Sequence, residues 1–205
     1  MTSRTVTARK DGGLAVVISG PSGVGKTTIW RTLAERYGYE LSISATTRAP
    51  RAGEKGGVDY RFVTREQFQE AVRRGEFLEH SEHFGNLYGT PKEPVEAALR
   101  NGRVILLQID VNGARQIMRR LSGTQRYCIF LQAPDLSEQE RRLRGRHSDS
   151  EASMRARLQR AEMEMAERLS YDASVVNDDV ERAVKEIHHL IQKAEVRKEN
   201  GCRTT

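Results

Sequence analysis

The sequence predicts an α/β fold in which helices flank a parallel β-sheet. Short apolar runs of strand length recur at residues 14–18, 104–110, 127–131 and 173–176. Segments with helical periodicity separate these runs. The first run leads directly into a glycine-rich loop and then into a helix. Because strands that alternate with helices are typical of parallel sheets, the whole pattern favours this fold class.

The glycine-rich loop at residues 20–27 matches the phosphate-binding pattern G-x-x-x-x-G-K-[ST] at every fixed position. Its glycines let successive backbone N–H groups point at a phosphate, and the helix that follows adds positive charge at its N-terminus. We expect Lys26 to reach the β- and γ-phosphates of ATP and Thr27 to bind Mg²⁺ through its hydroxyl. The loop thus predicts a P-loop NTPase-type sheet. The expected ATP-binding residues of the loop are Gly20, Pro21, Ser22, Gly23, Val24, Gly25, Lys26, Thr27 and Thr28.

Residues 44–90 interrupt the alternation of strands and helices and predict a small β-rich insertion. Residues 45–57 are rich in Gly, Pro and Arg and predict a surface loop. Thr64 and Gln67 match a capping box that would begin a helix. Around these features the pattern predicts strands at 41–44, 59–63 and 77–80, a helix at 64–74 and a turn at Gly85 and Asn86.

Helices are expected to connect the strands of the main sheet. Pro91 suits the first turn of the helix at 91–100, and Gly145 begins a break between two charged helices. The expected helices are at 28–37, 91–100, 114–120, 137–144, from about 151 to about 168, and 180–193. Residues 1–12 are expected to form a flexible basic tail, and residues 195–205 a polar tail.

Composition and charge narrow the classes of function. The 205 residues suit one domain. With 30% charged residues we expect a soluble protein, and the use of only two cysteines fits a reducing cytoplasm. No apolar run is long enough to span a membrane, and residues 1–13 lack the apolar centre of a signal peptide. Cys128 and Cys202 are expected to stay unpaired. Four of the six net positive charges lie in residues 1–11 and 193–205, so we expect neither a nucleic-acid nor a membrane partner.

Further motifs extend the pattern over residues 14–191. They are Ser19–Lys26, Ser44–Glu54, Asp59-Tyr60, Phe77–Glu79, Asn86–Thr90, Arg144–Arg146 and Val175–Asp179. Together they resemble the guanylate kinases, P-loop enzymes that reversibly convert ATP and GMP to ADP and GDP. The resemblance implies one domain at 13–194, with a core at 13–43, 91–141 and 161–194, a GMP-binding subdomain at about 44–90, and a helical lid at about 142–160.

The insertion carries the residues that the resemblance assigns to GMP. Arg48 and Arg51, three apart in a loop, can form a forked clamp on a phosphate dianion. A carboxylate at Glu79 can accept hydrogen bonds from N1–H and N2–H₂ of guanine, whereas adenine presents a bare acceptor at N1. The remaining residues that the resemblance implies are Tyr60 and Tyr88 at the phosphate, Ser44 and Thr90 at the guanine, and Asp110 beside GMP.

Phosphate transfer requires positioning and cations more than covalent help. The acceptor is a phosphate oxygen that is already largely ionised at neutral pH, so we expect no general base. Lys26 and Mg²⁺, carried in as MgATP, supply part of the positive charge. The resemblance implies that Arg142, Arg146 and Arg157 supply the rest and that Asn177 contacts adenine. Gln108 stands where the family commonly has aspartate, which removes one charge near the magnesium ion.

Two other functions are compatible with parts of the pattern. A non-catalytic guanylate-kinase-like binding module would have little use for the intact loop at 25–27. A P-loop kinase of a sugar phosphate would not need the carboxylate of Glu79. We therefore expect ATP and GMP or dGMP as substrates, and a monomer or small homo-oligomer.

Overall fold

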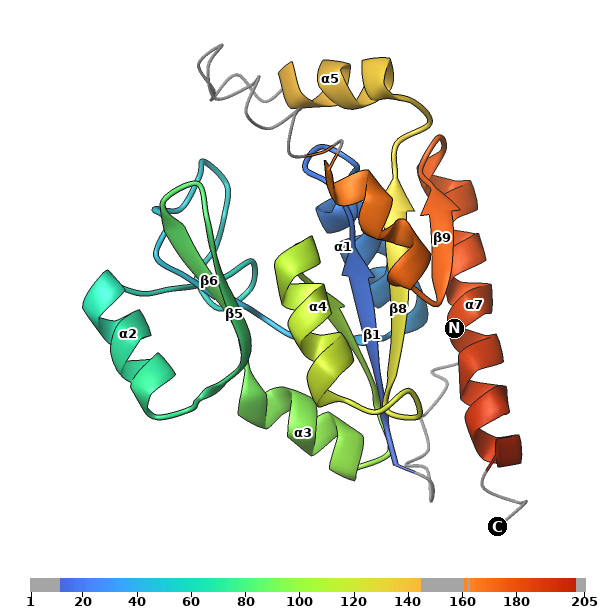
Figure 1. Cartoon of the computed structure of the whole chain (residues 1–205), viewed down its shortest axis with the longest axis horizontal. Helices are drawn as coiled ribbons and strands as arrows, with labels where there is room; N and C mark the ends of the chain where they lie inside the picture. The colour runs from blue at the N-terminus through green and yellow to red at the C-terminus, as the bar shows by residue number, and fades with distance from the viewer. Residues whose placement is uncertain (1–11, 145–160, 162, 202–205) are drawn as a thin grey trace.

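The core of the molecule is a parallel sheet of five strands in the spatial order β2-β7-β1-β8-β9, of which β1, β8 and β9 are labelled in Figure 1. The computed structural model describes residues 12–144, 161 and 163–201. The strands are β1 (Leu14–Ser19), β2 (Glu40–Leu41), β7 (Val104–Gln108), β8 (Arg126–Gln132) and β9 (Ala173–Val176). All their pairings are parallel. The central strand β1 is buried along its whole length, which explains its unbroken apolar run. The predicted fold class is confirmed.

Helices cover both faces of this sheet. On one face Val16 and Ile18 pack with α1 and α7, and on the other Ala15 and Val17 pack with α3 and α4. This division follows from the alternation of side chains along a strand. The helices are α1 (Lys26–Tyr37), α3 (Lys92–Arg100), α4 (Val111–Arg120), α5 (Leu136–Arg144) and α7 (Val180–Gly201), with a 3₁₀ turn η1 (Glu167–Ser170).

The predicted insertion forms a second sheet beside the first (Figure 1). Its strands, in spatial order, are β4 (Arg61–Phe62), β3 (Ala45–Thr46), β6 (Asn86–Pro91) and β5 (Phe77–His83), and α2 (Arg65–Arg73) packs on it. The predicted capping box is present, because Thr64 accepts from the Gln67 backbone and Gln67 accepts from the Thr64 backbone. Ala45, Phe68 and Phe77 form a small separate core.

Some element boundaries differ from the prediction. The strand expected at 41–44 ends at Leu41. The prediction of a surface loop at 45–57 is wrong for its first two residues, because Ala45 and Thr46 are buried in β3. The turn expected at residues 85–86 is one residue earlier, because Asn86 pairs with His83.

The last helix also differs from the prediction. Instead of ending near residue 193, α7 continues to residue 201 and takes up much of the expected polar tail. Residues 194–199 consist largely of Ala, Glu, Arg and Lys, which are strong helix formers. Much of the helix expected before residue 168, and most of the expected lid, lie outside the described residues.

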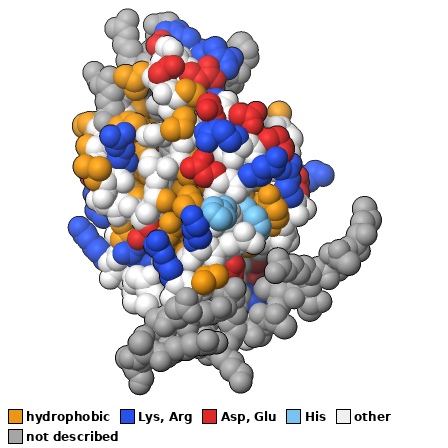
Figure 2. Space-filling view, turned by 90° about the vertical axis from the view of Figure 1, so that its right-hand side faces the viewer, with side chains coloured by type: hydrophobic (Ala, Val, Ile, Leu, Met, Phe, Trp, Pro, Cys, Tyr) orange, Lys and Arg blue, Asp and Glu red, His pale blue; other side chains and the backbone are white. Residues whose placement is uncertain are grey.

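The face that carries α7 is shown in Figure 2. Positive and negative side chains are interspersed with apolar ones over the described part of this face. Within the described residues, no helix combines the length and the apolar character needed to cross a bilayer.

Candidate active site

A cavity lies at the carboxyl ends of the core strands, between the phosphate loop and the insertion. Open α/β sheets bind ligands at this edge. Thirteen of the residues expected at the site line this one cavity, although they come from distant parts of the sequence. They are Gly20, Ser22, Gly23, Gly25, Lys26, Thr27, Ser44, Arg48, Arg51, Tyr60, Glu79, Tyr88 and Asp110.

The phosphate loop is closely packed, and Gly20 and Gly25 show why it needs glycine. A Cβ atom at Gly20 would lie 2.0 Å from the carbonyl oxygen of Leu131, and one at Gly25 would lie 2.4 Å from Nδ2 of Asn177. Both glycines also have positive φ values, 142° and 91°. A larger residue at either position would therefore displace the loop from Leu131 or Asn177.

Lys26 begins α1 and turns back over the loop. Its ammonium group donates hydrogen bonds to the carbonyl oxygens of Gly20 at 2.5 Å and Pro21 at 2.9 Å. Pro21 and Val24 are buried and are not among the residues that line the cavity, and Pro21 has no backbone N–H to offer a phosphate. Thr28 is exposed on the first turn of α1.

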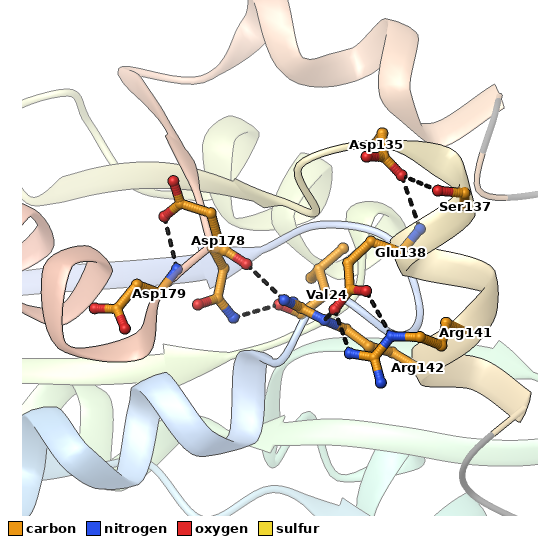
Figure 3. Close-up of polar contacts among 9 residues, drawn as sticks. Val24, Asp135, Ser137, Glu138, Arg141, Arg142, Asp178 and Asp179 are labelled. Carbon is orange, nitrogen blue, oxygen red and sulfur yellow. Dashed lines mark hydrogen bonds and ion pairs between the residues drawn. The ribbon is translucent and has the colours of Figure 1, made fainter.

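Behind the loop, Asn177 and Arg142 form a supporting network (Figure 3). Asn177 is 2% exposed, and its Nδ2 donates to the carbonyl oxygen of Val24 at 2.8 Å. Arg142 donates to the Asn177 carbonyl at 2.9 Å and to Glu138 Oε1 at 2.7 Å. Hydrogen bonds from Arg141 and then Arg142 lower the pKa of Glu138 to about 2.

This network places two expected site residues outside the lining of the cavity. Neither Arg142 nor Asn177 is among the residues that line it. Asn177 contacts the loop from behind at Val24, and Arg142 contacts Asn177. Arg146 and Arg157, also expected at the transferring phosphate, lie outside the described residues.

The insertion brings its two arginines and two tyrosines together on one side of the cavity. Arg48 donates to both carboxylate oxygens of Glu54, at 2.8 and 2.9 Å, and lies 5.5 Å from the ring centroid of Tyr60. Glu54 also accepts from the Arg51 backbone at 2.8 Å, so it fixes both arginine positions. The rings of Tyr60 and Tyr88 are 6.1 Å apart. Burial raises the pKa of Tyr60, so its phenol remains a hydrogen-bond donor at neutral pH.

Glu79 is a buried carboxylate at the deep end of the cavity. Its side chain is 3% exposed, and Oε1 accepts a hydrogen bond from the Thr90 hydroxyl at 2.6 Å. Thr90 is itself fully buried and stands behind Glu79. A Cβ atom at Gly113 would lie 2.5 Å from Glu79 Oε2, so glycine leaves the space that the carboxylate fills. Burial raises the pKa of Glu79 to about 7, and the nearby Asp110 charge adds to the rise.

Asp110 connects the end of β7 with the insertion. Its Oδ1 caps α4 by accepting from the Gly113 backbone at 2.7 Å, which starts the helix earlier than predicted. Its Oδ2 accepts from the Ser81 hydroxyl at 2.8 Å and lies 4.0 Å from Nδ1 of His83.

Sequence analysis missed several residues that line the cavity. Glu79, Ser81 and His83 share one face of β5, so the period of two along this strand could have indicated the last two. Phe84 and Asn86 belong to the tip of the same hairpin, and nothing in the local pattern marks them. The additional lining residues are Ser81, His83, Phe84, Asn86, Ile109 and Glu164. Gln108, which sequence analysis placed near the magnesium ion, lines the cavity as well.

The residues near Thr27 fit a magnesium ion that arrives with a nucleotide. No group of three or more His, Cys, Asp or Glu side chains in the described ranges could hold a metal by itself. Mg²⁺ commonly keeps several waters and is bound by one or two protein ligands together with substrate phosphates. The Thr27 hydroxyl can be such a ligand, and it accepts a hydrogen bond from Gln108 Nε2 at 2.9 Å.

Comparisons with known proteins by family model, by sequence and by structure all find the same family. The guanylate kinase family model matches residues 13–194. Guanylate kinase of Parasynechococcus marenigrum is 47% identical over 180 residues, covering 87% of this chain and 98% of the relative. That of Synechocystis sp. is 45% identical over 184 residues, covering 89% and 95%. The crystal structure of guanylate kinase from Anaplasma phagocytophilum superposes with a TM-score of 0.77 at 34% identity, covering 92% of this chain and 88% of that one.

Proposed function

The chain belongs to the guanylate kinase family, and from this premise we propose which of its residues bind GMP, which bind ATP and which assist the transfer of a phosphate from ATP to GMP. The activity is that of a nucleoside monophosphate kinase, an ATP:GMP phosphotransferase. The observation that carries our assignment is the buried Glu79 carboxylate, which lines the same cavity as Lys26.

GMP binds on the insertion side of the cavity. The ionised carboxylate of Glu79 accepts the two adjacent N–H donors of guanine, and Thr90 fixes one carboxylate oxygen by its hydrogen bond. Ser44, 9% exposed and lining the cavity, offers a further hydroxyl near the base. AMP is rejected because adenine would present an acceptor to the carboxylate and leave this buried group unpaired.

The phosphate of GMP binds where the insertion gathers its cations and phenols. Arg48 and Arg51 supply positive charge, and Tyr60 and Tyr88 donate hydrogen bonds without adding charge. Glu54 acts as a positioning residue, because it holds the Arg48 guanidinium and the Arg51 backbone together.

ATP binds on the phosphate loop. Backbone N–H groups of Gly20 and residues 22–25 surround its phosphates, and Lys26 moves from the loop carbonyls to the β- and γ-phosphates. Mg²⁺, held by the Thr27 hydroxyl, neutralises part of their charge when it is bound. Asn177 supports the loop from behind and remains the expected neighbour of adenine. On the acceptor side, dGMP serves as a second substrate.

Transfer requires no general base, since the attacking oxygen of GMP is ionised at neutral pH. Cationic side chains on the ATP side of the cavity must instead stabilise the negative charge of the transferring phosphate. Arg142 is the described residue that we assign to this role, together with Arg146 and Arg157. It would exchange its contact with Glu138 for the phosphate.

A panel of acceptors tests these assignments. With ATP as donor, we expect rapid ADP formation with GMP, slower formation with dGMP, and little with AMP, UMP or ribose bisphosphate. Binding of GMP without turnover would instead indicate a binding module, and a preference for ribose bisphosphate would indicate a sugar-phosphate kinase.

A further inference from the structure

The β5–β6 hairpin of the insertion ends in a turn of unusual composition. His83 pairs with Asn86, so the turn consists of the two residues Phe84 and Gly85. Their φ values are 49° and 74°, which correspond to a type I′ turn. Such turns favour Asn, Asp or Gly at both positions, and bulky residues rarely adopt a positive φ. Among the residues that the structure describes, Phe84 is the one non-glycine residue with a positive φ.

Packing in the protein core does not account for this residue. Phe84 is 38% exposed, and the described clusters of buried apolar side chains do not include it. Its ring meets that of His83 edge to face at 4.4 Å. By contrast, Phe68 and Phe77 of the same insertion are buried and stack at 4.5 Å. A strained residue that the core does not use is a candidate for a functional role.

The position of Phe84 in the cavity indicates what that role is. Along the hairpin, Glu79 pairs with Thr90 at the guanine end, Ser81 pairs with Tyr88 at the phosphate, and the turn follows. Phe84 therefore lies beyond the acceptor phosphate, and it lines the cavity together with residues of the phosphate loop. Figure 1 shows the tip of the hairpin at the same end of the molecule as the loop that follows β1.

We propose that Phe84 is a water-excluding residue of the phosphate-transfer site, an inference that rests on the proposed function. In productive transfer the bond between the γ-phosphorus and its bridging oxygen breaks, and a GMP phosphate oxygen forms the new bond. In the competing hydrolysis a water oxygen forms that bond and releases inorganic phosphate and a proton. An apolar ring over the meeting point of the two phosphates disfavours water there, and a lid of this kind favours transfer.

The strain at Phe84 provides a test with two readouts. Phe84→Asn places a favoured residue in the turn and removes the ring, so we expect a higher melting temperature and more hydrolysis of ATP by water. With saturating ATP and GMP, the ratio of inorganic phosphate to GDP should rise at least tenfold. Phe84→Leu keeps an apolar side chain and the strain, and its ratio and melting temperature should stay close to those of the parent.

Leu169→Asn serves as the matched control, because Leu169 is 87% exposed and does not line the cavity. It should leave the phosphate-to-GDP ratio unchanged. A ratio for Phe84→Asn within twofold of the parent, or a melting temperature that does not rise, would overturn the inference. If the parent protein makes no GDP at all, the proposed function fails instead, so the two failures are distinguishable.

Discussion

The side-chain amide of Gln108 donates a hydrogen bond to the hydroxyl oxygen of Thr27 across 2.9 Å, which joins the end of β7 to the phosphate loop. An ionised carboxylate at this position would be an acceptor only, and the Thr27 hydroxyl would then be the donor. The amide therefore engages one lone pair of the oxygen that we assign to Mg²⁺, and it brings no negative charge.

The first prediction concerns this pair. Gln108→Asp should lower the Mg²⁺ concentration for half-maximal activity by about tenfold, the lower end of the range for residues that orient metal ligands. A Mn²⁺ titration of the ADP complex, followed by electron paramagnetic resonance, should show the same shift without turnover. Gln108→Asn leaves the side chain a neutral amide and serves as the control. Identical titrations for Gln108→Asp and the parent would show that residue 108 is remote from the ion.

The second prediction concerns Lys26. Its ammonium group contributes most when charge develops between the β- and γ-phosphates, so Lys26→Met should lower kcat far more than it weakens ATP binding. We expect a loss in kcat of at least about a hundredfold, as for other single electrostatic groups at a transition state. Rapid-quench kinetics and calorimetric ATP binding measure the two quantities separately. A kcat within tenfold of the parent would mean that the loop binds ATP without assisting transfer.

The third prediction uses the space that Gly113 leaves for Glu79. Gly113→Ala puts a Cβ atom 2.5 Å from the present position of Glu79 Oε2, so the carboxylate must move. The KM for GMP should rise by tenfold or more while the KM for ATP stays nearly constant. Because alanine is the better helix former by about 1 kcal/mol, loss of fold should not explain the effect.

Gly123→Ala is the matched control for this substitution. No heavy atom lies within 4 Å of a Cβ atom built at Gly123, so we expect no change in either KM. Equal GMP kinetics for Gly113→Ala and Gly123→Ala would contradict the placement of guanine at Glu79.

The fourth prediction is a pH dependence of GMP binding. Burial raises the pKa of Glu79 to about 7, and guanine needs the ionised form, so GMP binding releases a proton when Glu79 starts protonated. At pH 6 only about a tenth of the carboxylate is ionised, so the dissociation constant should rise about tenfold between pH 8 and pH 6. Calorimetry in two buffers of different ionisation enthalpy measures both the affinity and the proton.

Glu79→Gln controls for the titration of the GMP phosphate itself, whose second pKa also lies near about 6. This variant should lose the part of the pH dependence that comes from the carboxylate. If the parent and Glu79→Gln have parallel pH profiles, Glu79 is not the titrating group.

Local signals explain which parts of the fold could be predicted. The loop at 20–27 and the strand before it were predictable because spacing and an apolar run lie within a few neighbouring residues. The strand at Ala45 and Thr46 was missed because its partners, in β4 on one side and β6 on the other, are not its neighbours in the sequence. Its own composition indicates a loop.

The site could be predicted from motifs, but its contacts could not. The family resemblance named Glu79, while the hydroxyl of Thr90 against it and the gap at Gly113 depend on tertiary packing. Phe84 carries no signal in the sequence, since its strain comes from the pairing of His83 with Asn86. The support of the loop by Asn177, which follows β9, likewise depends on a contact with a residue 153 positions earlier.

The most direct test of the account is the ratio of kcat/KM for GMP to that for AMP, measured in the parent and in Glu79→Gln with ATP as donor. We predict a ratio of about 10⁴ or more in the parent, because the buried carboxylate is left unpaired by adenine. In Glu79→Gln it should fall by at least about two orders of magnitude, mostly through GMP, since an amide cannot accept both donors of guanine. A ratio that is the same in both proteins would contradict the assignment of guanine recognition to Glu79.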